Sequence, residues 1–220
     1  MKPYYQDKYV TIFNCDCSEI LPSLPKVDLV LTDPPYGINI VKVGGSKSFG
    51  KVGGGNLVTP KDYLPVYGDD KPFDPQPFLQ YGNVQMFFGG NYFADKLPPS
   101  SCWLVWDKDN TGNFADCELV WTSLKKAVRR IIWRWNGLLQ EDMKHKEYRY
   151  HPTQKPVPVM KWCIQQYSEA QTILDPFMGS GTTLVAAKVL NKQCTGIEIE
   201  EKYCEIAARR CSQEVLELGI

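Results

Sequence analysis

The 220-residue sequence has no excess of charge of either sign and no long apolar run. Its 25 Lys and Arg residues balance its 25 Asp and Glu residues, so any surface that binds nucleic acid must be local. No run of 18 apolar residues occurs, and residues 1–10 carry no signal-peptide pattern. These absences predict a cytoplasmic protein that does not enter a membrane.

Histidine and closely spaced cysteines are also scarce. The eight cysteines include one Cys-x-Cys pair, Cys15 and Cys17, but no Cys-x-x-Cys, and the only histidines are His145 and His151. Structural zinc sites and disulfide frameworks normally show more regular spacing, so we expect buried free thiols and no bound metal. No repeat, low-complexity tail or linker interrupts the chain, which predicts one domain over residues 1–220.

The sequence does contain a regular alternation of apolar runs and helical segments. Strands are expected at residues 9–13, 27–32, 84–88, 102–106, 118–122, 131–135, 172–174 and 195–199, with 118–122 and 131–135 antiparallel. Helices are expected at 19–21 (capped by Ser18), 77–81, 92–96, 158–167, 184–190 and 201–218. Strand–helix–strand units at this spacing predict an α/β fold with a parallel sheet, whose ligands bind at the carboxyl ends of the strands.

The segment Asp33-Pro34-Pro35-Tyr36 directly follows the apolar run at 27–32. Proline fixes φ and has no N–H, so the two prolines hold carbonyl acceptors in set directions. Asp33 adds a carboxylate, and Tyr36 adds a ring that can stack. This set suits a planar group that carries an NH₂, such as a nucleobase; a plain strand followed by a Pro-Pro turn is the alternative.

A second pattern joins Asp175–Thr183 to Glu198, which lies 23 positions beyond Asp175. The glycines permit a tight turn between a strand and a helix, and the helix N-terminus can face the negative end of a ligand. An acid at the end of the next strand is placed to accept from ribose hydroxyls. Because neither Gly-Lys-Ser/Thr nor Gly-x-Gly-x-x-Gly occurs here, an adenosyl ligand without a pyrophosphate is favoured.

Two segments are rich in basic residues. Residues 41–63 contain six glycines and four lysines, which predicts a flexible lid or a loop that grips a nucleic-acid backbone; a plain surface insertion is the alternative. Residues 125–149 hold eight basic and three acidic residues, with aromatic residues interleaved. That local excess of positive charge is typical of a surface that binds a polyanion, although a solvated face over core tryptophans gives the same pattern.

Four segments in this order, residues 33–36, 151–156, 175–183 and 196–198, resemble the β class of amino-group (N6-adenine/N4-cytosine) DNA methyltransferases, which use S-adenosyl-L-methionine. The resemblance covers most of the chain. It implies a Rossmann-like methyltransferase fold with a circularly permuted motif order. It also implies base flipping, with the catalytic residues Asp33, Pro34, Pro35 and Tyr36. Asp33 in the first position favours N6 of adenine; N4 of cytosine, RNA and a protein amide are the alternatives.

The resemblance also assigns residues to the cofactor and to DNA. The cofactor residues are Asp16, Cys17, Thr153, Lys155, Asp175, Pro176, Phe177, Gly179, Ser180, Gly181, Thr182 and Glu198. Within that set, Glu198 holds the ribose, Asp16 the adenine amino group, and Thr153 and Lys155 the methionine end. The family often has glycine before the acid at Asp16, where this sequence has Cys15.

DNA contacts are expected from the 41–63 loop and from a small recognition segment at 107–150. The residues are Lys42, Lys47, Lys51, Lys125, Arg129, Arg130 and Arg134. The resemblance further implies duplex DNA as substrate, a possible homodimer, a restriction-modification role, and a bacterial, archaeal or phage-encoded protein. A non-catalytic binding subunit and a nucleotide-binding oxidoreductase are the competing classes; the intact Asp33–Tyr36 segment and the missing dinucleotide fingerprint argue against them.

Overall fold

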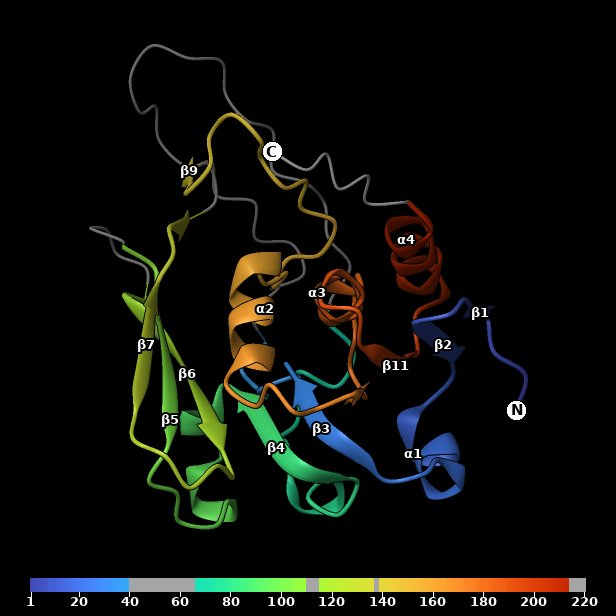
Figure 1. The fold of residues 1–220 in the computed structure, drawn as a ribbon. Helices are drawn as coiled ribbons and strands as arrows, with labels where there is room; N and C mark the ends of the chain where they lie inside the picture. Colours follow the sequence, from blue (N-terminus) through green and yellow to red (C-terminus); the bar gives the residue numbers. More distant parts are fainter. Residues whose placement is uncertain (40–65, 110–114, 137–138, 214–220) are drawn as a thin grey trace.

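The computed structural model describes residues 1–39, 66–109, 115–136 and 139–213, and its main element is a β-sheet (Figure 1). The described residues form nine strands in the order β1-β2-β11-β10-β3-β4-β6-β5-β7. Their bounds are β1 Tyr5–Gln6, β2 Val10–Asn14, β3 Val27–Thr32, β4 Gly82–Phe88, β5 Trp103–Asp107, β6 Cys117–Thr122, β7 Arg129–Ile132, β10 Thr172–Asp175 and β11 Gln193–Glu198. A separate hairpin pairs β8 Trp135–Asn136 with β9 Leu139–Gln140.

The five central strands β2, β11, β10, β3 and β4 run parallel. Their carboxyl ends therefore meet at one edge of the sheet, which we call the site edge. Strand β6 is antiparallel to both β4 and β5, so β6 begins at the site edge where its neighbours end. Strand β7 is parallel to β5 and is the last strand of the sheet on that side. The mostly parallel α/β sheet agrees with the fold class predicted from the sequence.

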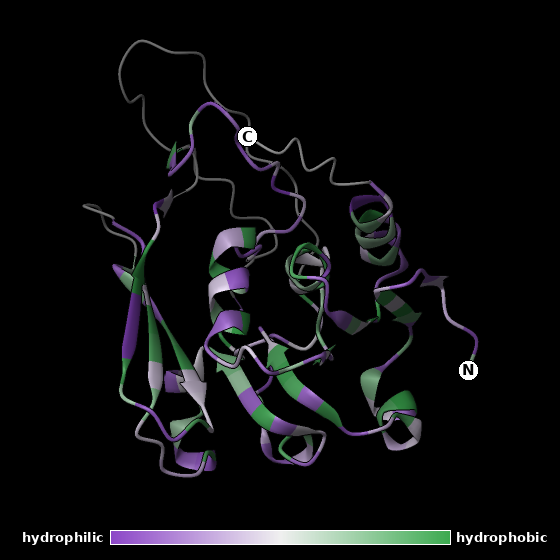
Figure 2. Cartoon of the chain, in the orientation of Figure 1, coloured by the Kyte–Doolittle hydropathy of each residue, from purple (hydrophilic) through white to green (hydrophobic). Residues whose placement is uncertain are grey.

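Both faces of the sheet are covered. Figure 1 shows α2 Val157–Gln165, α3 Thr182–Val189 and α4 Glu201–Ser212 on one face. The short α1 Cys17–Ile20 packs on the other face, as do 3₁₀ helices at Leu21–Ser23, Gln76–Phe78, Gly90–Tyr92 and Ala94–Lys96. Within β3, Leu29 and Leu31 pack toward the α2–α4 layer and Val30 packs toward the other layer. Burial on both faces explains the apolar run Leu29–Leu31 within β3, a strand that is mostly green in Figure 2.

Several predicted elements differ from those observed. The helix expected at 92–96 is two 3₁₀ segments, because Phe93 leaves helical geometry at φ −139° and ψ 31°. The cap of α1 is Asp16 rather than Ser18. Strands β6 and β7 are antiparallel, as expected, but both flank β5, and β7 spans Arg129–Ile132 instead of 131–135. Helix α4 ends at Ser212, and the predicted end of that helix lies beyond the described residues.

The loop predicted at 41–63 lies outside the described residues, as do Lys42, Lys47 and Lys51. The segment predicted for recognition, 107–150, contributes two strands of the main sheet, β6 and β7. All eight cysteines are unpaired, and five of them are buried. No helix in the described ranges is long and apolar enough for a membrane crossing, and the same residues hold no cluster of His, Cys, Asp and Glu suited to a metal ion.

Candidate active site

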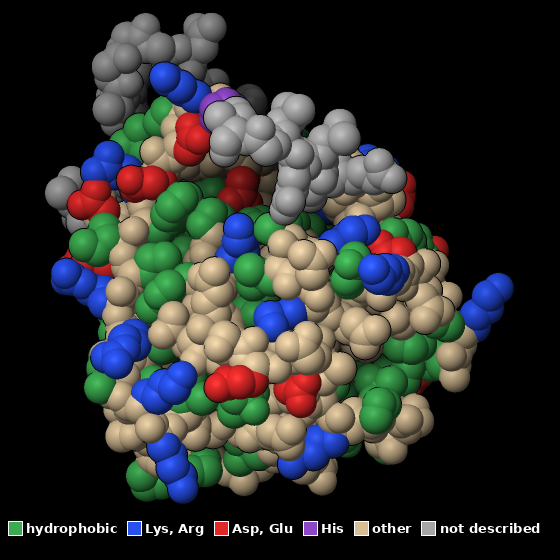
Figure 3. Space-filling view, in the orientation of Figure 1, with side chains coloured by type: hydrophobic (Ala, Val, Ile, Leu, Met, Phe, Trp, Pro, Cys, Tyr) green, Lys and Arg blue, Asp and Glu red, His purple; other side chains and the backbone are tan. Residues whose placement is uncertain are grey.

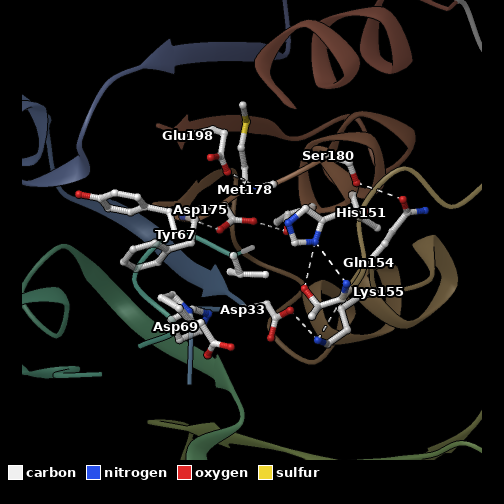
Figure 4. A pocket seen from close by; sticks show the side chains of 18 of the residues that line it. Asp33, Tyr67, Asp69, His151, Gln154, Lys155, Asp175, Met178, Ser180 and Glu198 are labelled. Carbon is white, nitrogen blue, oxygen red and sulfur yellow. Dashed lines mark hydrogen bonds and ion pairs between the residues drawn. The ribbon is translucent and has the colours of Figure 1, made fainter. Parts of the chain in front are cut away.

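A pocket lies at the site edge, where β3 and β10 end side by side (Figure 4). Leu29 of β3 pairs with Ile173 of β10, so the segments that follow the two strands enter the same space. Of the residues predicted for the site, those that line the pocket are Asp33, Pro34, Pro35, Tyr36, Thr153, Lys155, Asp175, Phe177, Gly179, Ser180, Thr182 and Glu198. The two sequence patterns, far apart in the chain, therefore meet in one pocket.

Asp33 is held at the end of β3 by two donors. Its Oδ2 atom accepts a hydrogen bond from Lys155 Nζ at 2.5 Å, and its Oδ1 atom accepts one from the Tyr36 hydroxyl. Burial raises the pKa of Asp33, and the Lys155 ammonium opposes that rise. Burial and the charge of Asp33 raise the pKa of Tyr36 well above its ordinary value, so Tyr36 stays a neutral donor. An incoming amino group has to share the oxygens of Asp33 with these donors or replace one of them.

The Tyr36 ring is fixed by its packing. It stacks on Tyr92 with ring centroids 4.9 Å apart and an interplanar angle of 15°. Tyr92 is 52% exposed, so this stack lies at the surface of the site. Beneath the ring, Gly89 directly follows β4 in the left-handed region at φ +66°, and a Cβ there would lie 2.2 Å from a Tyr36 ring carbon. Only glycine at this position leaves room for the ring.

Asp69 holds the backbone that follows Tyr36, and the sequence analysis did not identify it. Its Oδ1 atom accepts hydrogen bonds from the backbone N–H groups of Tyr36, Gly37 and Ile38 at 3.1, 2.9 and 3.2 Å. Asp69 is buried and lines the pocket (Figure 4). A carboxylate that accepts several backbone donors fixes a turn, so Asp69 sets the direction in which the chain leaves the Asp33–Tyr36 segment.

Asp175 uses both of its carboxylate oxygens inside the protein. Oδ1 accepts from Thr32 Oγ1 at 2.6 Å and from the Phe177 backbone at 3.2 Å, and Oδ2 accepts from Thr183 Oγ1 at 2.5 Å. Burial raises the pKa of Asp175 to about 6, against these hydrogen bonds, which lower it. The contacts join β3, β10 and the start of α3, so Asp175 shapes the turn between the two halves of the pocket.

The glycine-rich turn that follows is held from two sides. Gly179 N donates to Glu198 Oε2 at 3.0 Å, which brings the end of β11 to the pocket wall. Arg210 of α4 donates to the Ser180 carbonyl oxygen at 2.7 Å. Gly181 precedes α3 at φ +79°, and a Cβ there would lie 2.6 Å from Ala207 Cβ. Helices α3 and α4 can therefore approach closely only over a glycine.

The loop from His151 to Pro156 closes the pocket opposite β11. His151 Nδ1 lies 3.0 Å from Thr153 Oγ1, and burial lowers the pKa of His151 to about 4, so its ring is neutral at physiological pH. Gln154 is buried and accepts from Ser180 Oγ at 3.1 Å, which ties this loop to the glycine-rich turn (Figure 4). The carbonyl of Thr153 and the carboxylate of Asp33 both lie within reach of Lys155 Nζ.

The structure does not bring every predicted residue to the pocket. Asp16 and Cys17 are outside its lining, and Asp16 caps α1 by accepting from Ser18 N at 2.8 Å. Asp16 nevertheless lies at the site edge, two positions after Asn14, which pairs with Glu198. Two further predicted residues, Pro176 and Gly181, belong to the turn but do not line the pocket.

The predicted DNA contacts within the described residues are divided between the two edges of the sheet. Lys125 follows the end of β6 and Arg129 begins β7, so both lie at the edge opposite the pocket. Arg130 lies 3.7 Å from Asp107 within the sheet. Arg134 follows the end of β7 at the site edge, where it forms an ion pair with an aspartate, Asp109.

Comparison of the chain with known proteins finds similarity to DNA methyltransferases. Residues 105–209 match a family model described as DNA methylase. The chain is similar to the type II methyltransferase M.ScaI of Streptomyces caespitosus. The identity is 26% over a 261-residue alignment, which covers 99% of this chain and 86% of that protein. It is also similar to the type II methyltransferase M.HinfI of Haemophilus influenzae, with 26% identity, 96% of this chain and 70% of that protein. A shorter match to the type II methyltransferase M2.DpnII of Streptococcus pneumoniae is 42% identical over 81 residues, 36% of this chain and 30% of that protein.

Solved structures show the same fold. The PvuII DNA methyltransferase (cytosine-N4-specific) aligns with a TM-score of 0.64 and 15% identity, over 98% of this chain and 90% of that chain. The M1.HpyAVI–SAM complex aligns with a TM-score of 0.56 and 21% identity, over 93% of this chain and 100% of that chain. The mostly parallel α/β sheet is thus of the kind found in S-adenosylmethionine methyltransferases, which confirms the predicted fold class. The permuted motif order stays a prediction.

Proposed function

We propose that this chain, a relative of the N6/N4 amino-group DNA methyltransferases, transfers a methyl group from S-adenosyl-L-methionine to the N6 amino group of adenine in DNA. One observation carries the proposal. The acceptor-rich segment Asp33–Tyr36 and the glycine-rich turn with Glu198 line the same pocket. A group that donates a methyl and a group that accepts it must meet within a few ångströms, and this pocket brings together a site suited to each.

The residues at the β10 and β11 ends fit the cofactor. Glu198 is a half-buried carboxylate facing the pocket at the end of β11, as a ribose diol requires. The first turn of α3, after Gly181, offers backbone N–H groups to a carboxylate. When bound, S-adenosylmethionine supplies an electrophilic methyl group. Further cofactor contacts are proposed for Asp16 and Cys17 at the adenine and for Thr153 at the methionine end.

The residues after β3 fit an exocyclic amino group. Asp33 and the Pro34 carbonyl accept its two hydrogens, and Tyr36 stacks on the ring of the base. In a duplex the base must leave the helical stack before it can reach this pocket. Drawing both N–H bonds toward acceptors turns the nitrogen lone pair out of conjugation with the ring, which aims it at the methyl carbon.

Asp33 also supplies a route for the proton that the amino group loses. Transfer of a methyl group from sulfur to the amino nitrogen would leave that nitrogen positively charged and its remaining protons acidic. Burial raises the pKa of Asp33, which makes it a better acceptor for that proton than an exposed aspartate. Lys155 lines the same pocket and contacts Asp33, so it lies between the proposed cofactor residues and the proposed base-binding residues.

Mapping of modified bases in a plasmid carried by cells that express the protein tests the substrate. We expect N6-methyladenine at a short sequence, absent from DNA of cells without the protein. N4-methylcytosine instead would assign the alternative base of the same family. A plasmid with no modified base, from cells that contain folded protein, would contradict the proposal. The type II names of the relatives also favour a restriction-modification role, for which a nuclease encoded nearby is the evidence to seek.

A further inference from the structure

A row of four alternating charges runs from the pocket into the far half of the sheet. Lys155 Nζ lies 2.5 Å from Asp33 Oδ2 and 3.2 Å from Glu118 Oε2. Lys108 Nζ lies 2.6 Å from the other oxygen of Glu118, Oε1. The four side chains are between 6% and 23% exposed. Ion pairs screened from water to this degree interact much more strongly than pairs on an open surface.

The strand order explains how Glu118 comes close to Lys155. Because β6 runs against its neighbours, its second residue lies at the site edge, where Glu118 pairs with Trp106 of β5. Lys108 follows the end of β5, and Lys155 comes from the loop before α2. Among the described residues, no donor makes a hydrogen bond of good geometry to Glu118 Oε2, so its closest partner is the Lys155 ammonium.

We propose that Glu118 is a positioning residue for the methyl transfer, and that it acts by sharing the Lys155 ammonium with Asp33. An ammonium bound to Asp33 alone neutralises that carboxylate and competes with the substrate amino group for it. With Glu118 on its other side, Lys155 is held between two acceptors, and Asp33 keeps the capacity to accept from the substrate. Lys108 balances the charge of Glu118. This inference rests on the proposed role of Asp33.

The electrostatics give the two neighbours opposite effects on Asp33. The Lys155 cation lowers the pKa of Asp33 and the Glu118 anion raises it, on top of the larger rise from burial. Burial raises the pKa of Glu118, but the positive charges of Lys155 and Lys108 lower it by more. The pKa of Glu118 therefore lies below its ordinary value. The remaining groups that face this row are Tyr36 and Asp175 toward Asp33 and His151 toward Lys155, and none is altered by the variants below. 

Titration of Asp33 by carbon NMR of labelled aspartate carboxyls tests the inference, with Asp33→Asn to assign the resonance. We expect Glu118→Gln to lower the pKa of Asp33 by about one unit, and Lys155→Met to raise it by about one to three units. The acid limb of the pH profile of kcat shifts in the same two directions. A role in packing alone reduces activity in both variants without moving the titration in opposite directions.

Two further variants complete the experiment. Glu205→Gln is the matched control, because Glu205 forms an exposed pair with Arg209 on α4; no shift of Asp33 is expected. Lys108→Met leaves the charge of Glu118 unbalanced and is expected to raise the pKa of Asp33; it decides the matter if Glu118→Gln does not fold. Shifts of the same sign in Glu118→Gln and Lys155→Met, or no shift in Lys108→Met, overturn the inference. The titration needs no turnover, so a wild type that binds S-adenosylmethionine without methylating DNA would refute the proposed function separately.

Discussion

At the scale of single residues, the site depends on three carboxylates with different partners, of which Asp175 is buried and Asp33 and Glu198 are half-buried. Asp33 is paired with a cation, Asp175 is satisfied by hydroxyls, and Glu198 accepts from backbone N–H groups. Each carboxylate lies at the end of a parallel strand or directly after it. Burial opposes the charged form of all three, and the partners decide how much charge each can keep.

Asp175 predicts a specific pH dependence of stability. Its pKa is raised to about 6 in the folded protein from an ordinary value of 3.8. A carboxyl group of this kind stabilises the fold fully below its unfolded pKa, and that contribution is lost as pH rises through the folded pKa. We therefore expect the unfolding free energy of Asp175→Asn, relative to wild type, to increase by up to about 3 kcal/mol between pH 4 and pH 7. Urea unfolding across this range measures it, and a difference that stays constant with pH would contradict the prediction.

Sequence reasoning identified the residues of the site that are contiguous in the chain. Asp33–Tyr36 and Asp175–Thr183 are short segments whose chemistry can be read directly. Asp69 and Glu118 were missed because Asp69 reaches the pocket, and Glu118 reaches Lys155, only through tertiary structure. Asp69 binds a backbone segment more than 30 positions earlier, and Glu118 depends on the direction of β6. An antiparallel strand beginning at the site edge is the signal that could have indicated Glu118.

At the scale of the elements, the end of β4 controls the Tyr36 ring. Gly89→Ala places a methyl group within overlap distance of that ring, so we expect the ring to move and methyl transfer to fall on the order of 10²-fold. Binding of S-adenosylmethionine should be unchanged, since Gly89 does not line the pocket. Turnover rates and calorimetry measure the two effects.

Gly68→Ala is the control for that substitution. Gly68 also has a positive φ, +78°, but its added Cβ would meet only Pro35 Cγ at 3.5 Å, an ordinary contact. The strain in the backbone is thus similar and the overlap is removed. We expect a loss of stability with little loss of turnover in this variant. Equal losses of turnover in the two variants would show that strain, rather than the position of Tyr36, is responsible.

Most strands of the parallel core could be predicted from the sequence. The elements outside that core were predicted less well. Strand β3 was expected at its observed bounds, because its residues are mostly apolar and the segment Asp33-Pro34-Pro35 follows it. Strands β6 and β7 run antiparallel, as expected, but each pairs with β5 instead of with the other, because sequence spacing alone gives no order for strands in a sheet. The helix expected at 92–96 failed because Gly89 and Phe93 divide that region into short 3₁₀ turns.

At the scale of the whole molecule, the positions of the basic side chains bear on the direction from which DNA approaches the pocket. Figure 3 shows Lys and Arg side chains scattered among acidic ones on the face in view. Of the predicted DNA contacts, Arg134 lies at the site edge, whereas Lys125 and Arg129 lie at the opposite one. A duplex that delivers a base to the pocket has to approach the site edge.

The position of these basic residues predicts different effects on DNA affinity. Arg134→Ala should weaken binding and reduce the salt dependence by about one released counterion. Lys125→Ala should change neither, because Lys125 lies at the far edge of the sheet. Fluorescence anisotropy with duplex DNA at several salt concentrations measures both. An equal loss in the two variants would place the DNA on a different face.

The central claim is that Asp33, at the end of β3, accepts the amino group that is methylated. Its most direct test is transfer of labelled methyl from S-adenosylmethionine to duplex DNA by wild type and Asp33→Ala, with cofactor binding measured by calorimetry on the same preparations. We predict transfer to an exocyclic amino group by wild type, loss of transfer in Asp33→Ala, and cofactor affinity that is largely unchanged. Turnover by Asp33→Ala close to that of wild type would contradict the claim.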